Sequence, residues 1–203
     1  SVIQTSGDVH ASLNADTVCS FIGTKFSASC SVVYKDNVVS FFNLTLLDLE
    51  AEGVFQGLVL FIRDSILKAG YSRSMTGHMN LRRQYHQAYT ALKLGGEINP
   101  QLWIHHFDQI AVPYILRQAT RILPGNMLCY EKLLDLVQSD KVQNTEYIKT
   151  LRTYLEHNLN TVQSAKALFI HRSTFLYRLE RIRTILETDL EDADELFYLN
   201  LSL

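Results

Sequence analysis

Residues 160–187, NTVQSAKALFIHRSTFLYRLERIRTILE, decide how the C-terminal part of this 203-residue chain folds. Asn160 or Thr161 can cap a first short helix, since both residue types are favoured at helix N-termini. We expect that helix to run through Phe169. A second helix should begin near His171 or Ser173 and end at about Glu187. The stretch therefore predicts two helices joined by a tight turn.

The second helix has one apolar and one polar side. At helical spacing, a single buried stripe is expected from Leu176, Leu179, Ile182 and Leu186. Turned away from that stripe are Arg172, Ser173, Thr174, Tyr177, Arg178 and Arg181. A short helix, a turn of three or four residues and a cation-bearing second helix are typical of a helix-turn-helix that binds DNA.

The charge distribution supports DNA binding more strongly than the net charge does. The chain carries a formal charge of −2, which argues against indiscriminate nucleic-acid binding. Between Thr161 and Arg183, five cations and one acid leave a local charge of +4. Six acids follow between Glu187 and Glu195 without a cation. This contrast indicates a focused phosphate-binding face beside a surface that repels DNA. Backbone donors at the start of the second helix, residues 171–174, would add to the attraction.

A simpler interpretation stays open from the pattern alone. Amphipathic helices often carry arginines on a solvated face that binds nothing. For His171 in particular, a role in the turn or as a helix cap is an alternative to direct DNA contact.

The residue string from Ser164 to Ile182, SAKALFIHRSTFLYRLERI, resembles the C-terminal helix-turn-helix of PucR/CdaR-type bacterial transcription regulators. That motif runs roughly T-A-x-x-L-x-[VI]-H-R-N-T-L-x-Y-R-L-x-R-I. The upstream stretch Leu151–Asn158 is similar to the L-x-x-Y-L-x-x-N helix of the same family. A looser similarity to factor-for-inversion-stimulation-type helix pairs is also present. The resemblance covers about the last sixty residues.

The resemblance implies a set of DNA-contacting residues. Arg172, Ser173, Thr174 and Tyr177 would approach base edges or phosphates, and Arg178 and Arg181 would contact phosphates at the groove wall. The full expected set is Lys166, His171, Arg172, Ser173, Thr174, Tyr177, Arg178 and Arg181. Ser173 replaces the family's Asn, and Phe175 replaces its following Leu. Because Asn can bond adenine with two hydrogen bonds and Ser cannot, base preference at position 173 is open.

Length and composition describe an ordinary globular protein with room for two small domains or for one domain with a substantial core. The best apolar run, residues 57–62, stops at Arg63 and is too short to span a bilayer. No signal peptide is recognisable. The three cysteines are scattered and odd in number, which favours reduced thiols and a cytoplasmic location.

The C-terminal part should be all helical, because no proline follows Pro124 and apolar residues repeat at helical spacing. We expect helices over about 127–139, 144–158, 161–169, 172–187 and 192–203. The last helix should pack across the recognition pair. The region around 128–137 and this last helix would form the seam of a homodimer, since a single small helix-turn-helix rarely binds tightly enough alone.

The N-terminal part follows a different pattern. Two β-rich runs, residues 29–34 and 38–44, flank Lys35-Asp36-Asn37 and predict a hairpin. Helices are expected over 49–69, ended by Gly70, and over 79–94, closed by Gly95-Gly96. Residues 71–75 and 103–107 are possible strands. This order suggests a small antiparallel or mixed sheet with helices on one side.

The segment from Gly70 to Leu92 is similar to the pattern of a degenerate GGDEF-like domain, which precedes the helix-turn-helix in PucR/CdaR-type regulators. Gln84 and Gln87 replace that pattern's Ser and Glu. The fold class is thus α+β: a GGDEF-like domain over 1–122, a helical linker over 123–143 and a helix-turn-helix domain over 144–203. The resemblance implies an upstream sensor domain in the full-length protein.

Catalysis is not expected. A working cyclase of that class needs a Gly-Gly-acid hairpin and carboxylates that hold Mg²⁺, and the hairpin here contains no glycine. His105 and His106 would point to opposite faces of a strand, and no metal, cofactor or phosphate-loop motif is present. The partners expected are double-stranded DNA and a second copy of the chain, with no membrane. The alternative is a nucleotide-sensing or cyclase-like enzyme domain with an incidental helical tail.

Overall fold

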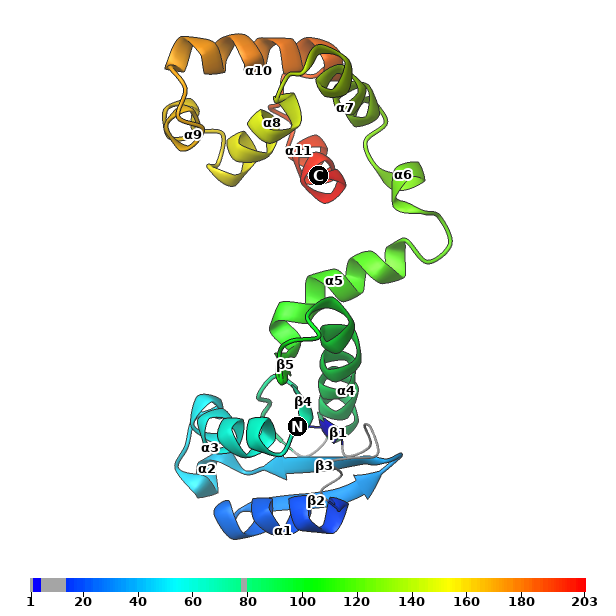
Figure 1. Cartoon of the computed structure of the whole chain (residues 1–203), viewed down its shortest axis with the longest axis vertical. Coiled ribbons are helices and arrows are strands. Elements are labelled where there is room, and N and C mark those ends of the chain that lie inside the picture. Colours follow the sequence, from blue (N-terminus) through cyan, green and yellow to red (C-terminus); the bar gives the residue numbers. More distant parts are fainter. Residues whose placement is uncertain (1, 5–13, 78–79) are drawn as a thin grey trace. The chain divides into compact units, whose positions relative to one another are not determined.

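The computed structural model describes residues 2–4, 14–77 and 80–203. The chain divides into two compact units, Ser1–Gln118 and Ala119–Leu203. Figure 1 labels their helices and strands.

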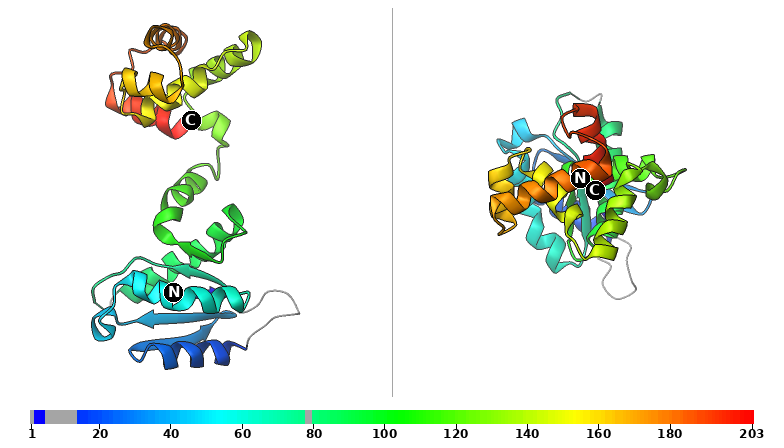
Figure 2. Two further views of the ribbon diagram at one scale, coloured as in Figure 1. Left: turned by 60° about the vertical axis from the view of Figure 1, so that its left-hand side comes forward. Right: turned by 90° about the horizontal axis from the view of Figure 1, so that it is seen from above.

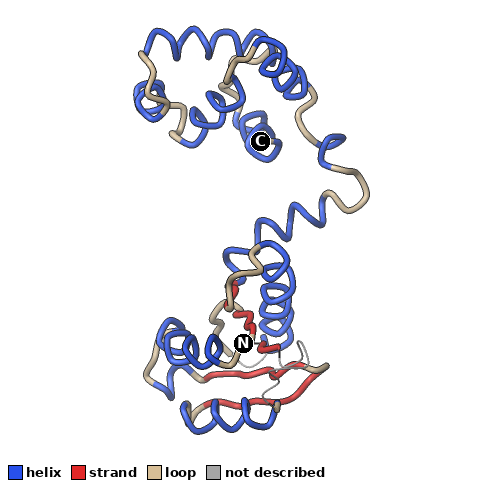
Figure 3. Tube along the Cα trace, viewed as in Figure 1, coloured by secondary structure: helices blue, strands red, loops and turns tan. Residues whose placement is uncertain are grey.

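The first unit is built on a five-stranded mixed sheet in the order β2-β3-β1-β4-β5. Its strands, drawn red in Figure 3, are β1 (Val2–Gln4), β2 (Ser29–Tyr34), β3 (Asn37–Phe42), β4 (Lys68–Tyr71) and β5 (Ile104–His106). The pairs β2–β3, β3–β1 and β1–β4 are antiparallel, and β4–β5 is parallel. The expectation of a mixed sheet is confirmed.

The predicted hairpin is confirmed, with a tighter turn than the sequence suggested. Strands β2 and β3 are joined by Lys35 and Asp36 alone, which have φ angles of 48° and 59°. Two consecutive residues with positive φ form the turn that best matches the twist of antiparallel strands. Asn37 already belongs to β3, and its side-chain amide donates a hydrogen bond to the Lys35 carbonyl at 2.7 Å.

Helices cover both faces of this sheet, so the expectation of helices on one side was wrong. Helices α1 (Ala15–Lys25) and α3 (Ala51–Asp64) share a core with Val38, whereas α4 (Leu81–Ile98) packs on Val39. Successive side chains of a strand point to opposite faces, and both valines are apolar. Each face therefore needs its own cover, and Figures 1 and 2 show α1 and α4 on different sides of β2 and β3.

Two helix ends differ from the prediction. Helix α3 ends at Asp64, five residues before the predicted end, because Lys68 and Ala69 pair with β1 as part of β4. Helix α4 continues through Gly95-Gly96 to Ile98 instead of closing there. Three helices of this unit were not anticipated, namely α1, α2 (Leu44–Leu47) and α5 (Phe107–Ala119).

Gly70 and Gly95 are sites of close approach rather than helix caps. A Cβ atom on Gly70 would lie 2.0 Å from the Ala88 carbonyl oxygen, and one on Gly95 would lie 2.5 Å from the His105 ring. The missing side chains let α4 lie directly on β4 and β5. This contact fixes α4 on its face of the sheet.

The second unit is all helical among its described residues, as expected. Its helices are α6 (Gly125–Leu128), α7 (Lys132–Gln143), α8 (Tyr147–Glu156), α9 (Thr161–Ala167), α10 (Arg172–Leu186) and α11 (Ala193–Ser202). One core joins α7 to α11, with Leu136, Leu151, Phe175, Ile182 and Leu199 fully buried. The sequence assigned residues 123–143 to a linker, but Leu133 and Leu136 of α7 lie inside this core.

Helix α11 packs on the other helices of this unit through Leu199. Two hydrogen bonds join α11 to Tyr130, which lies just before α7. The Tyr130 hydroxyl donates to the Glu195 carboxylate at 2.7 Å, and the Tyr130 amide donates to the Ser202 hydroxyl at 2.9 Å. Among the described helices of the chain, none combines the length and apolar character that a membrane crossing requires.

We expect Gly70→Ala to destabilise the first unit by about 1–3 kcal/mol, because the new methyl group overlaps the backbone of α4. Chemical denaturation followed by circular dichroism measures the change. Gly23→Ala is the matched control, since a Cβ there, in the last turn of α1, meets nothing within 4 Å. This control should raise stability by about 0.5–1 kcal/mol. Equal stability of the two variants would contradict the close approach of α4.

Candidate nucleic-acid interface

The first helix of the pair, α9, is capped as its sequence predicts. The Asn160 side chain accepts hydrogen bonds from the amides of Val162 at 3.1 Å and Gln163 at 3.0 Å. Ser164 and Ala165 are buried against the neighbouring helices, where their small side chains allow close packing. Helix α9 is thereby held on the core by its small-residue face.

The turn between the helices follows a well-defined capping pattern. The Ile170 amide bonds to the Ala165 carbonyl at 3.1 Å, and the Phe169 amide bonds to the Lys166 carbonyl at 3.1 Å. These two bonds and the left-handed conformation of Phe169, with φ at 54°, make a Schellman motif. Ile170 packs on the core, while the Phe169 side chain is 96% exposed. The sequence placed Phe169 inside the first helix, which instead ends at Ala167.

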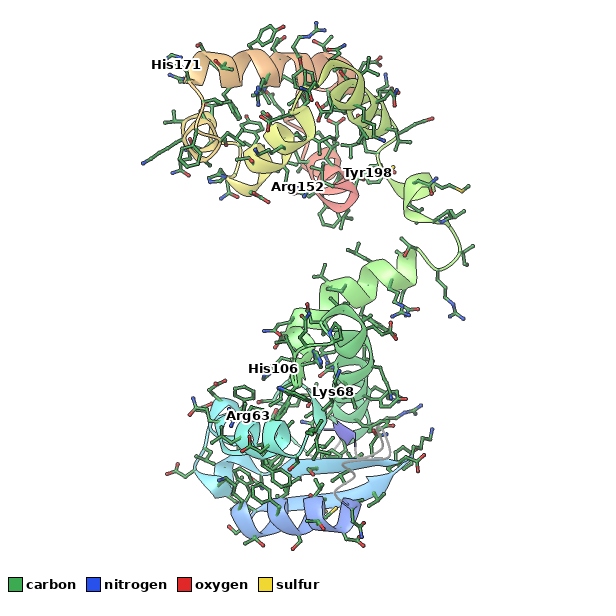
Figure 4. All side chains as sticks on the ribbon, viewed as in Figure 1. Arg63, Lys68, His106, Arg152, His171 and Tyr198 are labelled. Carbon is green, nitrogen blue, oxygen red and sulfur yellow. The ribbon has the colours of Figure 1, made fainter. Side chains whose placement is uncertain are left out.

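Helix α10 begins at Arg172 with His171 as its N-cap. The His171 Nδ1 atom accepts from the Ser173 amide at 3.3 Å and lies 2.7 Å from the Ser173 hydroxyl. The capping alternative for His171 is thus what the structure shows. Figure 4 shows its side chain at the start of α10, at the outer end of the helix pair.

The buried stripe of α10 is shifted by one residue from the prediction at its start. Its buried residues are Phe175, Leu179, Ile182 and Leu186. Leu176, which the sequence assigned to the stripe, is 42% exposed. Phe175 packs its ring on Tyr154 of α8 with the centroids 5.8 Å apart, so the larger side chain fills the first position of the stripe.

The opposite face of this helix pair is open to solvent. Of the eight expected contact residues, seven are exposed: Lys166, His171, Arg172, Ser173, Thr174, Tyr177 and Arg181. They lie on the last turn of α9, at the cap of α10 and along its first three turns. The structure therefore brings these residues to one helix pair and leaves their side chains accessible.

Residues 147–203 match the family model of the PucR C-terminal helix-turn-helix domain. This segment is similar to a PucR-type helix-turn-helix.

Three curated relatives support the same assignment. The chain is 29% identical over 129 residues to the "Carbohydrate diacid regulator" of Escherichia coli, which covers 63% of this chain and 32% of that protein. It is 29% identical over 119 residues to the "Purine catabolism regulatory protein" of Bacillus subtilis, covering 58% of this chain and 22% of the relative. It is 40% identical over 57 residues to the "Proline-responsive transcriptional activator PutR" of Bacillus subtilis, covering 28% of this chain and 14% of the relative. The chain thus spans a third or less of each of these relatives.

Among solved structures, the "Regulator of Polyketide Synthase Expression" from Bifidobacterium adolescentis aligns with 99% of this chain and 77% of that chain. The TM-score is 0.35 and the sequence identity 13%.

Within this helix pair, Arg178 differs from the other expected contacts. Its side chain is only 22% exposed and lies 3.1 Å from a carboxylate oxygen of Glu146, just before α8. The same guanidinium lies 3.3 Å from the Thr150 hydroxyl. Arg178 thus joins α10 to the start of α8, and a phosphate contact by this residue stays a prediction.

Two acidic residues, Asp140 and Glu146, link α8 to its neighbours α7 and α10, and the sequence pattern did not predict either role. The Asp140 carboxylate accepts hydrogen bonds from the amides of Tyr147 at 2.7 Å and Ile148 at 2.9 Å, so a residue of α7 caps α8. Hydrogen bonds from Lys149 and then Arg178 lower the pKa of Glu146 below its ordinary value of 4.5. The cap comes from seven residues upstream, outside the usual helix-start pattern, so the sequence carries no clear signal for it.

No described histidine of the first unit belongs to a group of three side chains that could hold a metal ion. His105 is buried against Gly95, and burial lowers its pKa, with a smaller effect from Lys68. Across the described residues, no group of three His, Cys, Asp or Glu side chains is placed to hold a metal ion.

The Glu146 ion pair gives a pH-dependent prediction. Because its pKa is lowered in the folded state, its stabilisation is present above pH 4.5 and is lost as the pH falls through the folded-state value. Glu146→Gln should therefore be less stable than the parent protein at pH 7, and the difference should shrink progressively as the pH falls below 4.5. Urea denaturation at a series of pH values from 7 downward measures the difference in the free energy of unfolding. A difference that persists in acid would show that the pair does not act through its charge.

Proposed function

We propose that this chain is the C-terminal part of a DNA-binding transcription regulator that reads the major groove with α10. The family match of residues 147–203 and the regulator relatives support this function. The observation that carries it is the accessible set of basic and hydroxyl side chains at the start of α10. The opposite face of that helix is fixed in the core.

The proposed contacts follow from position along the helix pair. The exposed N-terminal turn of α10, with Arg172, Ser173 and Thr174, would enter the groove first. Tyr177 lies one turn further on, and Lys166 and Arg181 flank this set with charges suited to phosphates. His171, as the cap, would hold the first turn of α10 in place and present its second ring nitrogen outward.

Base discrimination would differ from that of relatives with Asn at position 173. The Ser173 hydroxyl offers one donor and is already 2.7 Å from His171 Nδ1. Because this hydroxyl also interacts with the N-cap residue His171, it would give a weaker base preference than an Asn that makes two hydrogen bonds to adenine. Arg172, whose fork can bond guanine twice, then becomes the main candidate for base readout.

For the first unit we propose a GGDEF-like fold without catalytic activity. The β2–β3 hairpin turns on Lys35 and Asp36, without the glycines that would let phosphates approach. This unit would act as a scaffold or dimerisation domain. A nucleotide-sensing role is the alternative, and titration calorimetry with GTP and Mg²⁺ distinguishes the two.

We further propose that the natural protein is longer, with a sensor domain upstream, and acts in the cytoplasm. The support is that the chain spans 32% and 22% of its first two relatives. The names of the three relatives refer to different metabolites, so they do not indicate which class of effector this protein would bind.

Arg172→Ala should weaken binding to operator DNA about tenfold or more, since a lost bidentate base contact costs roughly 1–3 kcal/mol. Lys166→Ala should weaken binding to all sequences alike and reduce the salt slope of log K by about one. Fluorescence anisotropy titrations at several salt concentrations measure both effects.

Lys141→Ala is the matched control, because Lys141 is an exposed cation on α7 that does not belong to the expected contact set. Its affinity and salt slope should equal those of the parent chain. Unchanged affinity in both Arg172→Ala and Lys166→Ala would exclude this helix pair as the DNA-binding surface.

We also propose that the regulator binds DNA as a homodimer through the last helix and the region around 128–137. Within that region, Leu133 and Leu136 are committed to the unit's own core, which leaves Leu134 and, on α11, Phe197 and Leu201 as exposed apolar side chains. Phe197 is the most exposed of these three at 65%.

Phe197→Glu should therefore shift the protein toward monomer, because a charge at an apolar seam is not compensated. Sedimentation velocity with a two-half-site operator measures the stoichiometry, two chains per duplex for the parent and one for the variant. Ile122→Glu, at an exposed apolar side chain before α6 and outside both the proposed seam and the helix pair, is the control for added negative charge. A parent protein that binds such an operator only as a monomer would contradict the dimer.

A further inference from the structure

The aromatic residue Phe169 lies in the turn between α9 and α10, just before the His171 cap that Figure 4 labels. At 96% exposed, it is the most accessible of the large apolar residues that the structure describes. Its neighbours Leu168 and Ile170 both pack on the core of the second unit. Single exposed apolar side chains are common, so exposure alone assigns no role to Phe169. Its backbone conformation and the charges around it supply further evidence.

The backbone of Phe169 has a conformation that favours glycine. Its φ of 54° lies in the left-handed region, which is strained for a residue with a bulky side chain. The corresponding position of a Schellman motif is usually glycine and sometimes asparagine. In the same unit Leu190 has a φ of 59°, but it is only 2% exposed, so its packing offsets the strain. Phe169 has no such packing, and a strained position of this kind indicates a role outside the fold.

The charges around Phe169 are positive. Residues 157–179 contain Lys166, Arg172 and Arg178 and no acidic residue. The Phe169 amide donates a hydrogen bond to the Lys166 carbonyl at 3.1 Å, and Arg172 begins α10 three residues further on. Lys166 and Arg172 are both exposed, and the ion pairs of the described residues include neither of them. A partner at this turn therefore meets an apolar ring between two cations.

Double-stranded DNA offers a matching surface. Its phosphates carry the negative charge that Lys166 and Arg172 attract. Beside the phosphates it exposes apolar atoms, namely the carbon atoms of deoxyribose and, in the major groove, the C5-methyl group of thymine. Phenylalanine is among the side chains that contact this methyl group. An apolar protein surface, in contrast, would leave both cations without a counter-charge.

We propose that Phe169 is a DNA-contacting residue, whose ring packs on apolar atoms of a nucleotide beside the groove that α10 enters. This inference rests on the proposed DNA-binding function and adds an apolar contact to a set that is otherwise cationic and polar. Phosphate contacts by Lys166 and Arg172, on either side of Phe169 in the chain, would hold the ring against the duplex. Binding covers the ring, and its burial stabilises the complex.

Phe169→Gly separates a DNA contact from a structural role, because the two roles predict opposite results. Glycine adopts a positive φ without strain, so the midpoint of thermal unfolding should stay the same or rise. DNA affinity should nevertheless fall about tenfold, as expected when the burial of one apolar ring is lost. The salt slope of log K should not change, since no charge is removed. Phe169→Tyr keeps the ring and should bind as tightly as the parent chain.

Fluorescence anisotropy measures these affinities on a duplex that the parent chain selects from a random-sequence pool. Ile122→Gly is the matched control, because Ile122 is 90% exposed and lies outside the helix pair, and its affinity should equal that of the parent chain. The same duplex with deoxyuridine in place of every thymidine lacks the methyl groups. If the ring packs on a thymine methyl group, this replacement weakens binding of the parent chain more than binding of Phe169→Gly. Equal losses in the two proteins assign the contact to deoxyribose.

Unchanged affinity in Phe169→Gly, while Arg172→Ala still weakens binding, would overturn this inference and leave the proposed function intact. A fall in both affinity and unfolding midpoint would also overturn it, because Phe169 would then act within the fold. So would a reduced salt slope, which would show that the substitution had displaced a cation. A parent chain that selects no duplex from the pool would contradict the proposed function itself, and this inference with it.

Discussion

The C-terminal unit depends on the burial of one helical stripe, Phe175, Leu179, Ile182 and Leu186. Burying four such side chains contributes roughly 6–12 kcal/mol at about 1.5–3 kcal/mol each. This is comparable to the whole stability of a small domain, about 5–15 kcal/mol. The stripe therefore fixes the rotation of α10 about its own axis. That rotation, in turn, decides which of its polar side chains reach solvent.

Much of this unit could be predicted from its sequence because local signals agree with the fold. Asn160 caps α9, no proline follows Pro124, and apolar residues repeat at helical spacing, so the existence and order of α7 to α11 follow. That Phe175 rather than Leu176 belongs to the buried stripe was harder to predict. The two residues are adjacent and both apolar, and which one is buried depends on the space beside the Tyr154 ring, which the spacing of apolar residues does not describe.

In the first unit, the errors arose from glycine and from the sheet. Gly70 and Gly95 looked like helix ends, but each allows a close contact between elements far apart in the chain. Because the contacting residues are distant in the sequence, the residues around each glycine do not indicate this role. In the candidate interface, the exposed positions of α10 were predictable from the stripe, whereas the pairing of Arg178 with Glu146 was not. Glu146 is 32 residues away in the chain and meets α10 only after folding.

The capping of α8 by Asp140 has a mechanical consequence. Asp140 ties the end of α7 to the start of α8, Arg178 ties α8 to α10, and Lys132 at the start of α7 pairs with Glu187 just beyond α10. Polar contacts at both ends and a shared apolar core join α7, α8 and α10 into one packed unit. Because of these links, a rotation of α7 would carry α10 with it.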